Sequence, residues 1–545
     1  MTQADLLRLY QGQFKLIKTL NYCSWQKLFL PLVLLNYFLS LMWSFPTTNI
    51  SSINKINEYK SQFSPATNYL DTNLEFGISL SGDNQEKSRG EEEVLTIKNH
   101  KNYTANQLPL EIYFPSPQDK SKTLSNSNTA DFTSNITLDK ASEQVVTMLE
   151  KNLIQEYSDY FGEDFQGKLV NPQNIQDILV DMHRQTGKKS AVIYILVYQD
   201  QLQIILLTQK GQPILKTVPG VNREQLRNTA MMFSGEITDF RNLNTTSYLP
   251  LAQKLYNWLI APIATALEKA NIDTLLFSID SGFRLLPLAA LHDGEQFLIE
   301  KYNFSLIPSF SLINHNYNSL KNTQVLAMGA SKFSEQPPLP AVSVELTTIT
   351  QKLWQGNSFL NEEFTRQNLI YQHQNYPYSI IHLATHAEFI SGDVSQSYIQ
   401  LWNEKLQLHQ IGELGWNNPE VELLVLSACR TAVGDKNSEL GFAGLAIATG
   451  VKSAVGSLWL VNDEATLGLM TEFYSHLGNL NIKAEALREA QLAMLKGKVV
   501  IEKGILRGSV SGREMSLPAE LANIQNQKFS HPYYWAGFTM VGSPW

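Results

Sequence analysis

The sequence predicts an α/β fold of three layers, with a mostly parallel sheet between two layers of helices. Two observations carry this prediction. Short, almost continuous apolar segments, such as 274–280 (TLLFSID) and 421–429 (VELLVLSAC), are typical of strands buried on both faces. Between them lie segments whose apolar residues recur at helical spacing, such as 249–270. The chain has 545 residues, 43% of them hydrophobic, which is enough for two or three domains with substantial cores.

The chain begins with a basic stretch and an apolar run. Residues 28–45 (LFLPLVLLNYFLSLMWSF) carry no charge and follow several Lys and Arg residues, so we expect residues 1–46 to form a signal sequence or a membrane anchor in an apolar helix. A signal-peptide cut after Ser44 would place the bulky Met42 two positions upstream, where a small residue is expected. This favours an uncleaved anchor. The rest of the chain is then expected outside the cytoplasm, membrane-anchored or, after cleavage, secreted. Pro31 and Asn36 are unfavourable in a helix that faces lipid. The alternative is therefore a buried hydrophobic helix at the start of a soluble domain.

Residues 47–140 are rich in Ser, Thr, Asn, Gln and Lys, and they bury too little apolar surface to offset chain entropy. We interpret them as a polar, largely disordered tether. The net charge of −8 and the absence of a basic stripe or block argue against a nucleic-acid partner.

The folded part is expected to begin near residue 141. A helix is predicted first, followed by a hairpin, a long helix and then alternating strands and helices. The predicted strands and helices, in chain order, are helix 145–162, strands 190–198 and 201–208, helix 249–270, strands 274–280 and 324–331, helix 342–354, strand 359–362, helix 365–374, strands 379–389 and 421–429, helix 441–450, strand 452–460, and helices 466–477 and 483–495.

Two of these predicted strands run apolar up to a reactive side chain. Segment 379–389 (SIIHLATHAEF) reaches His386, and segment 421–429 reaches Cys429. In a parallel sheet the chemistry lies at the carboxyl ends of the strands. The 43 residues between them leave room for one intervening unit, so we expect the two ends side by side. The only other cysteine is Cys23, which excludes a disulfide framework and a cysteine-rich zinc site.

Several motifs resemble those of one protein family in the family's order. They are IIHLATHAEF, LLVLSACRTAVGD, ELGFAGLAIATGVKSAVGSLWLVND and the final HPYYWAGFTMVGSPW, with LLFSIDSGFRLLPLAALHDGEQFLIEKYNFSLIPS upstream. The chain resembles, over roughly residues 145–545, the CHAT domain family, a bacterial branch, here of cyanobacterial type, of the caspase–separase clan. The resemblance implies a caspase-like domain with a non-catalytic portion at 141–320 and a catalytic portion at 321–545.

The resemblance implies a cysteine endopeptidase that acts on protein or peptide substrates, with Cys429 as nucleophile and His386 as base. The backbone amides of Cys429 and Ala387 are the expected oxyanion donors, although the clan commonly has Gly at the position of Ala387. A catalytically silent scaffold or regulated binding module on the same fold is the alternative function. A regulatory protein partner is expected, but no tetratricopeptide period precedes the domain.

No metal or other cofactor is expected. His382 and His386 have the spacing of a helical zinc motif, but their segment reads as a strand, a Leu occupies the place of the general-base Glu, and no third ligand is evident. We therefore expect His382 to be a core residue or to lie behind the dyad.

Specificity is expected to depend on a pocket beside the nucleophile, as in the clan. The candidate lining residues are Asp393, Asp435, Glu439 and Trp459. An acidic lining would suit substrates cleaved after Lys or Arg, whereas the alternative is that these acids are ordinary solvated loop residues.

Overall fold

The structure is a computed structural model that describes residues 130–165, 169–390, 395–431, 436–509, 514–522, 524 and 526–545. The chain divides into two units, Met1–Lys120 and Ser121–Trp545, and all described residues lie in the second. The apolar run 28–45 and most of the predicted tether therefore lie outside the described residues. Within the described part, no helix combines the length and apolar character needed to cross a bilayer.

Two sheets hold the strands. The larger sheet contains β1 (Ser190–Val197), β2 (Gln201–Leu207), β3 (Ile214–Pro219), β4 (Thr274–Ile279), β5 (Asn303–Leu306), β6 (Gln324–Gly329), β7 (Gly356–Leu360), β8 (Tyr378–Phe389), β9 (Tyr398–Gln400), β10 (Lys405–Gln407), β11 (Leu423–Thr431), β12 (Ser453–Ser457) and β17 (Phe538–Gly542). The smaller sheet contains β13 (Val500–Glu502), β14 (Ile505–Arg507), β15 (Met515–Ser516) and β16 (Gln527–Lys528).

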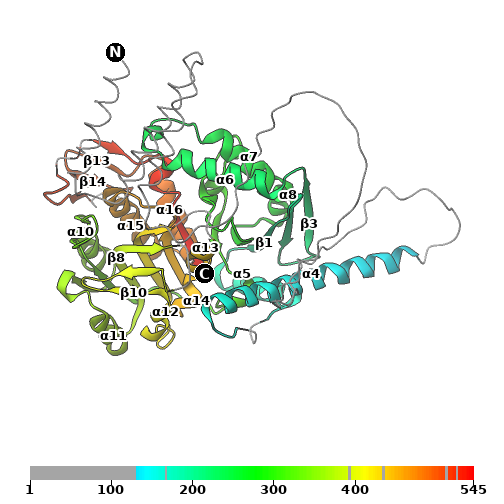
Figure 1. Cartoon of the computed structure of the whole chain (residues 1–545), viewed down its shortest axis with the longest axis horizontal. Coiled ribbons are helices and arrows are strands. Elements are labelled where there is room, and N and C mark those ends of the chain that lie inside the picture. The colour runs from blue at the N-terminus through cyan, green and yellow to red at the C-terminus, as the bar shows by residue number, and fades with distance from the viewer. Residues whose placement is uncertain are drawn as a thin grey trace, which may run out of the picture. The chain divides into compact units, whose positions relative to one another are not determined.

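The α-helices are α4 (Ala130–Phe161), α5 (Pro172–Thr186), α6 (Arg223–Thr238), α7 (Leu249–Leu259), α8 (Ala261–Ala270), α9 (Leu298–Lys301), α10 (Val342–Thr348), α11 (Arg366–Asn375), α12 (Leu408–Ile411), α13 (Lys436–Ala443), α14 (Leu445–Thr449), α15 (Asp463–Leu477) and α16 (Lys483–Leu495). Helices α10, α15 and α16 pack together on one side of the sheet, while α11, α12, α14 and α4 lie on the other (Figure 1). The prediction of a mostly parallel sheet between helices is thereby confirmed.

The order of the large sheet brings two parallel halves together. From one end it runs β10-β9-β8-β11-β12-β17-β5-β4-β1-β2-β3, with β6 also beside β8 and β7 beside β6. Strands β7, β6, β8, β11 and β12 are mutually parallel, and so are β17, β5, β4 and β1. Because β17 is antiparallel to β12, the two halves run in opposite directions within one sheet.

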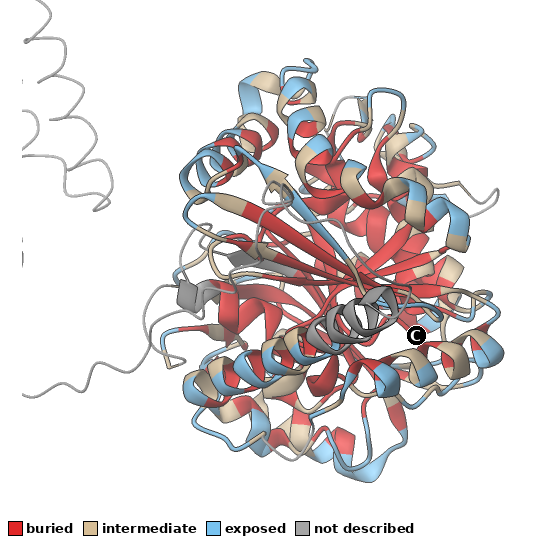
Figure 2. Cartoon of the chain, turned by 90° about the vertical axis from the view of Figure 1, so that its right-hand side faces the viewer, coloured by how far each residue is buried: buried red, intermediate tan, exposed pale blue. Residues whose placement is uncertain are grey.

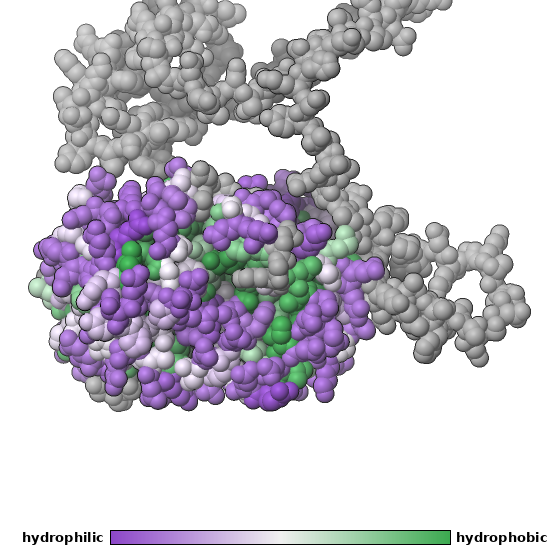
Figure 3. Space-filling view, turned by 90° about the horizontal axis from the view of Figure 1, so that it is seen from below, coloured by the Kyte–Doolittle hydropathy of each residue, from purple (hydrophilic) through white to green (hydrophobic). Residues whose placement is uncertain are grey.

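Burial explains why the central strands are mostly apolar. All but two residues of β8 are buried, since helices cover both faces of the sheet. Figure 2 shows the buried strands crossing the middle of the domain, with exposed residues on the outer sides of the helices. From below, the surface is mostly hydrophilic, with hydrophobic side chains gathered in a band across its middle (Figure 3).

Two predicted boundaries are wrong. Helix α4 begins at Ala130, ten residues before the predicted end of the tether. The single long helix predicted for 249–270 is broken at Ile260 into α7 and α8, because Pro262 stands in the first turn of α8 and cannot donate a helical hydrogen bond. The predicted hairpin of β1 and β2 is confirmed by their antiparallel register.

Candidate active site

The register of β8 and β11 explains why two residues 43 positions apart become neighbours. The lower parts of the strands pair with this same offset, from Ile380 with Leu423 to Leu383 with Leu426. The register then shifts by one residue, so that His386 pairs with Ala428, and Cys429 pairs with Ala387. A bulge therefore lies immediately before the candidate dyad, a place where bulges commonly redirect side chains.

The pairing places the backbones of His386 and Cys429 diagonally across adjacent strands. With strands about 4.8 Å apart and a rise of about 3.3 Å per residue, their Cα atoms are roughly 6 Å apart. The side chain of Cys429 lies outside the described residues. The predicted proximity of the two strand segments is confirmed.

Both strands continue past the candidate dyad. β8 ends at Phe389, as predicted, and β11 ends at Thr431, two residues beyond its predicted end. The reason is that β9 pairs antiparallel with the end of β8, through Ala387 with Ile399 and Glu388 with Tyr398, and keeps it extended. Ala387 is fully buried between two strands.

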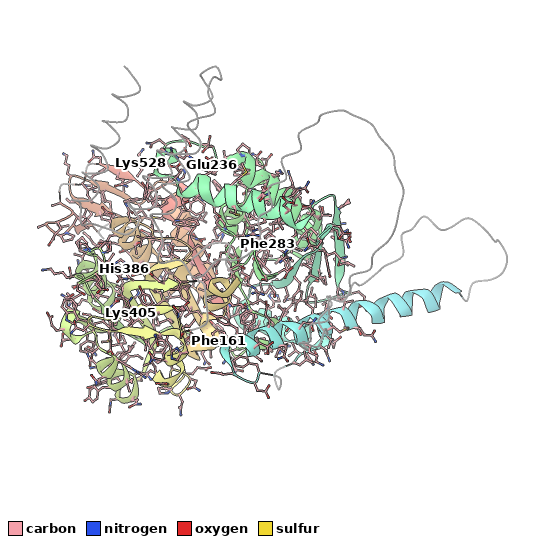
Figure 4. All side chains as sticks on the ribbon, viewed as in Figure 1. Phe161, Glu236, Phe283, His386, Lys405 and Lys528 are labelled. Carbon is pink, nitrogen blue, oxygen red and sulfur yellow. The ribbon has the colours of Figure 1, made fainter. Side chains whose placement is uncertain are left out.

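His386 lies in the half of the sheet that contains β8 (Figure 4). Its side chain is nearly buried, and its ring lies 4.8 Å, centroid to centroid, from the ring of Phe333. Its Nε2 is 2.9 Å from the backbone oxygen of Pro337. Because a carbonyl oxygen can only accept, Nε2 carries the proton and donates it.

The environment of His386 keeps its imidazole neutral. Burial lowers the pKa of His386, and the opposing effects of the Pro337 carbonyl and the Glu388 charge are smaller. A neutral ring with its proton on Nε2 has a free lone pair on Nδ1. Nδ1 is therefore the atom available to accept a proton.

The loop that carries Pro337 is tied to the helix that follows β12. The backbone N–H of Ala341 donates to Oδ2 of Asp463 at 2.5 Å. Burial raises the pKa of Asp463 to about 7. Because Asp463 is the first residue of α15, this contact fixes the loop over the ends of the central strands.

Of the three candidate acids of the specificity pocket, the described part of the chain includes only Glu439. Asp393 and Asp435 lie outside the described residues. Glu439 is 1% exposed, and its Oε2 accepts the backbone N–H of Gly282 at 2.7 Å. Its charge also raises the pKa of Arg284, so Glu439 joins α13 to the loop after β4 instead of lining an open pocket.

Glu388 is an acid beside the dyad that the sequence reasoning missed. It lies two residues after His386 and raises the pKa of that imidazole. Its backbone is level with Arg430 and with Tyr398, and its side chain accepts a hydrogen bond from the Tyr398 hydroxyl. The alternation of a strand could have indicated it, because residues i and i+2 share a face.

Trp459, the remaining pocket candidate, is largely buried. Its Nε1 donates to the backbone oxygen of Tyr533 at 2.9 Å, and its own carbonyl accepts the hydroxyl of Ser457 at 2.7 Å. A Cβ at Gly537 would come within 2.8 Å of the indole, so the packing there requires a glycine. The indole is a fixed wall at the end of β12.

His382 is a core residue, as expected. It is fully buried within β8, and its Nε2 donates to Oε1 of Glu345 at 2.8 Å. The Tyr474 hydroxyl, whose pKa is raised well above 10 by burial, lies 3.2 Å from Nδ1 and donates to it. Both ring nitrogens are thus occupied. Within the described residues, no group of three or more His, Cys, Asp or Glu side chains could hold a metal ion.

The fold and site define a mixed α/β domain with a candidate Cys–His pair on adjacent parallel strands. The sequence then assigns the chain to a family. Residues 249–543 match the family model of the CHAT domain, and because this is more than half of the chain, the chain belongs to the CHAT domain family.

Solved structures similar to this chain include two of the Saccharomyces cerevisiae separase–securin complex, at 2.6 and 3.0 Å resolution. They are 10% and 11% identical and cover 68% of this chain, each with a TM-score of 0.41. The matched region is 31% and 30% of those chains, so this chain spans about a third of their length. No curated protein matches the chain.

Proposed function

We propose that the protein is a cysteine endopeptidase in which Cys429 and His386 form the catalytic dyad. The observation that carries the proposal is the pairing of β8 with β11, which makes the two residues diagonal neighbours. The tautomer of His386 supports it, because Nε2 donates its proton to the Pro337 carbonyl and the lone pair of the neutral ring is then on Nδ1. Membership in the CHAT domain family supports the same chemistry.

In the proposed reaction, the Cys429 thiol transfers its proton to Nδ1 of His386 while the sulfur attacks the peptide carbonyl carbon. The C–N bond then breaks, and the leaving amine takes the proton from Nδ1. Next, water gives a proton to Nδ1 and attacks the thioester. The carbon–sulfur bond breaks, the acid product leaves, and Cys429 regains its proton.

The oxyanion hole stays a prediction. The backbone amides of Ala387 and Cys429 are adjacent across β8 and β11, which supports a shared role. Such donors must face the oxygen on which negative charge develops. Substitution of Ala387 by Gly keeps the amide and restores the residue common in the clan, so we expect it to preserve cleavage.

Cleavage after Lys or Arg also stays a prediction. Of the described residues, Glu388 supports it, because its charge lies beside His386. Asp393 and Asp435 stay candidates, whereas the buried position of Glu439 removes the basis for including it.

The test compares the cleaved protein termini produced by the wild-type chain and by Cys429→Ala, with Cys23→Ala as the matched control. We expect cleavages that disappear in Cys429→Ala and persist in Cys23→Ala. If both variants leave the set of termini unchanged, the peptidase proposal fails and the silent scaffold becomes the better account.

We propose in addition that residues 28–45 anchor the chain in a membrane and place the catalytic domain outside the cytoplasm. The basic flank and the uncharged run support this. Membrane fractionation of the full chain and of a 28–45 deletion tests it, and recovery of both in the soluble fraction would contradict it. A regulatory protein partner stays a prediction.

A further inference from the structure

An exposed leucine marks the end of the strand beside the nucleophile strand. Leu460 is 43% exposed, although the neighbouring Trp459 is largely buried. β12 pairs parallel with β11 through Leu424 with Ala454 and Val425 with Val455. The same register, carried forward, brings the chain after β12 to the level of Cys429.

A second contact places this segment at the dyad independently of the register. Three residues after Leu460, Asp463 accepts the backbone N–H of Ala341. Ala341 ends the loop in which Pro337 contacts His386. The segment after β12 therefore returns to the loop that touches the imidazole.

The backbone of Leu460 is hydrogen-bonded to Tyr533, which connects this segment to a second exposed apolar side chain. The Tyr533 hydroxyl donates to the backbone oxygen of Leu460 at 3.1 Å, and the Tyr533 carbonyl accepts from Trp459. The ring of Tyr533 also meets Phe240 edge-on at 5.4 Å between centroids. Phe240 is 71% exposed. We call Leu460, Trp459, Tyr533 and Phe240 the apolar wall.

We infer that the apolar wall binds an apolar side chain of the substrate next to the scissile bond. This inference rests on the proposed peptidase function. Leu460, near the dyad, and Phe240, connected to it through Tyr533, are both exposed, and a Leu, Met or Phe side chain that covers them removes apolar surface from water.

The experiment maps the cleavage sites of the full chain in a peptide library derived from a proteome, reading the residues on both sides of each cut. Wild type is compared with Leu460→Asp, with Leu215→Asp as the matched control. Leu215 is also a partly exposed leucine, at 38%, but lies on β3 at the far end of the sheet. Cys429→Ala defines the background.

We expect one position flanking the cut to be enriched in Leu, Met or Phe. In Leu460→Asp this enrichment should fall about tenfold, the usual scale for loss of an apolar subsite contact, while Leu215→Asp leaves it unchanged. Cleavage that depends on Cys429 but shows no apolar enrichment, or an enrichment unaltered in Leu460→Asp, would overturn the inference and leave the peptidase proposal intact. A library with no cleavage dependent on Cys429 would overturn both.

Discussion

Replacing Arg284 by Met should destabilise the domain, because Arg284 is a buried charge shared by three parts of the fold. Its Nε donates to the backbone oxygen of Ile279 at 3.0 Å, and its guanidinium pairs with Glu156 of α4. Its carbon Cζ lies 5.4 Å from the ring centre of Tyr157. The charge of Glu439 on α13 acts on it as well.

The magnitude follows from what the substitution leaves behind. Met keeps an unbranched apolar stem but removes the guanidinium, so Glu156 loses its ion pair with Arg284 and Glu439 loses one nearby positive charge. Removal of one partner from a buried charge pair costs about 3–5 kcal/mol. Because the Glu156 side chain is 21% exposed and can be partly hydrated, we expect the low end, about 3 kcal/mol. The thermal midpoint should then fall by about 5 °C.

The assay is thermal unfolding of Arg284→Met against Arg184→Met. Arg184 pairs with Asp181 at 3.0 Å, but its side chain is 73% exposed, so its loss should cost at most about 0.5 kcal/mol. Adding Glu439→Gln to Arg284→Met should recover part of the loss, since the amide oxygen still accepts from Gly282. Equal midpoints for the two single variants, or a further drop in the double variant, would refute the reasoning.

Three further predictions concern pH. The Asp463 carboxyl has a pKa of about 7 in the folded chain and therefore binds its proton more tightly there than in the unfolded chain. It destabilises the fold increasingly as pH rises from about 4 to 7. Asp463→Asn should therefore raise the thermal midpoint at pH 8 but not at pH 4. Burial lowers the pKa of His531 to about 4, so its contribution to stability is lost as pH falls from 6.5 towards 4, and His531→Asn should reduce the drop in midpoint between pH 7 and pH 5. Glu388→Gln removes a charge that raises the pKa of His386, so the acid limb of Cys429 alkylation should move to lower pH; an unmoved or higher limb would contradict the assigned electrostatics.

The sequence predicted the parts of the fold that local patterns determine. β8 and β11 could be found because both faces of the sheet are covered and most of their residues are apolar. The 43-residue separation of His386 and Cys429 even equals the offset with which the first halves of β8 and β11 pair, from Ile380 with Leu423 onward. The bulge before His386 could not be predicted, since it adds one residue within a continuous strand and leaves no signal in the residue types.

The remaining differences depend on tertiary contacts. β17 is short and apolar like its neighbours, and only its pairing with β12 reverses the direction of half the sheet. Glu439 looked like a loop acid because its partners, Gly282 and Arg284, lie more than 150 residues earlier in the chain. The contact of His386 with Pro337 could not be predicted from residue types, because it is made by a backbone carbonyl, although this carbonyl sets the tautomer of His386.

The central claim is that His386 activates Cys429, and the most direct test is the rate of iodoacetamide alkylation at each cysteine at pH 7, resolved by mass spectrometry. A thiol with an ordinary pKa near 8.5 is only a few per cent ionised at this pH. We predict that Cys429 reacts faster than Cys23, and that His386→Gln slows Cys429 about tenfold while leaving Cys23 unchanged. Equal rates at Cys429 in the wild type and in His386→Gln would contradict the claim.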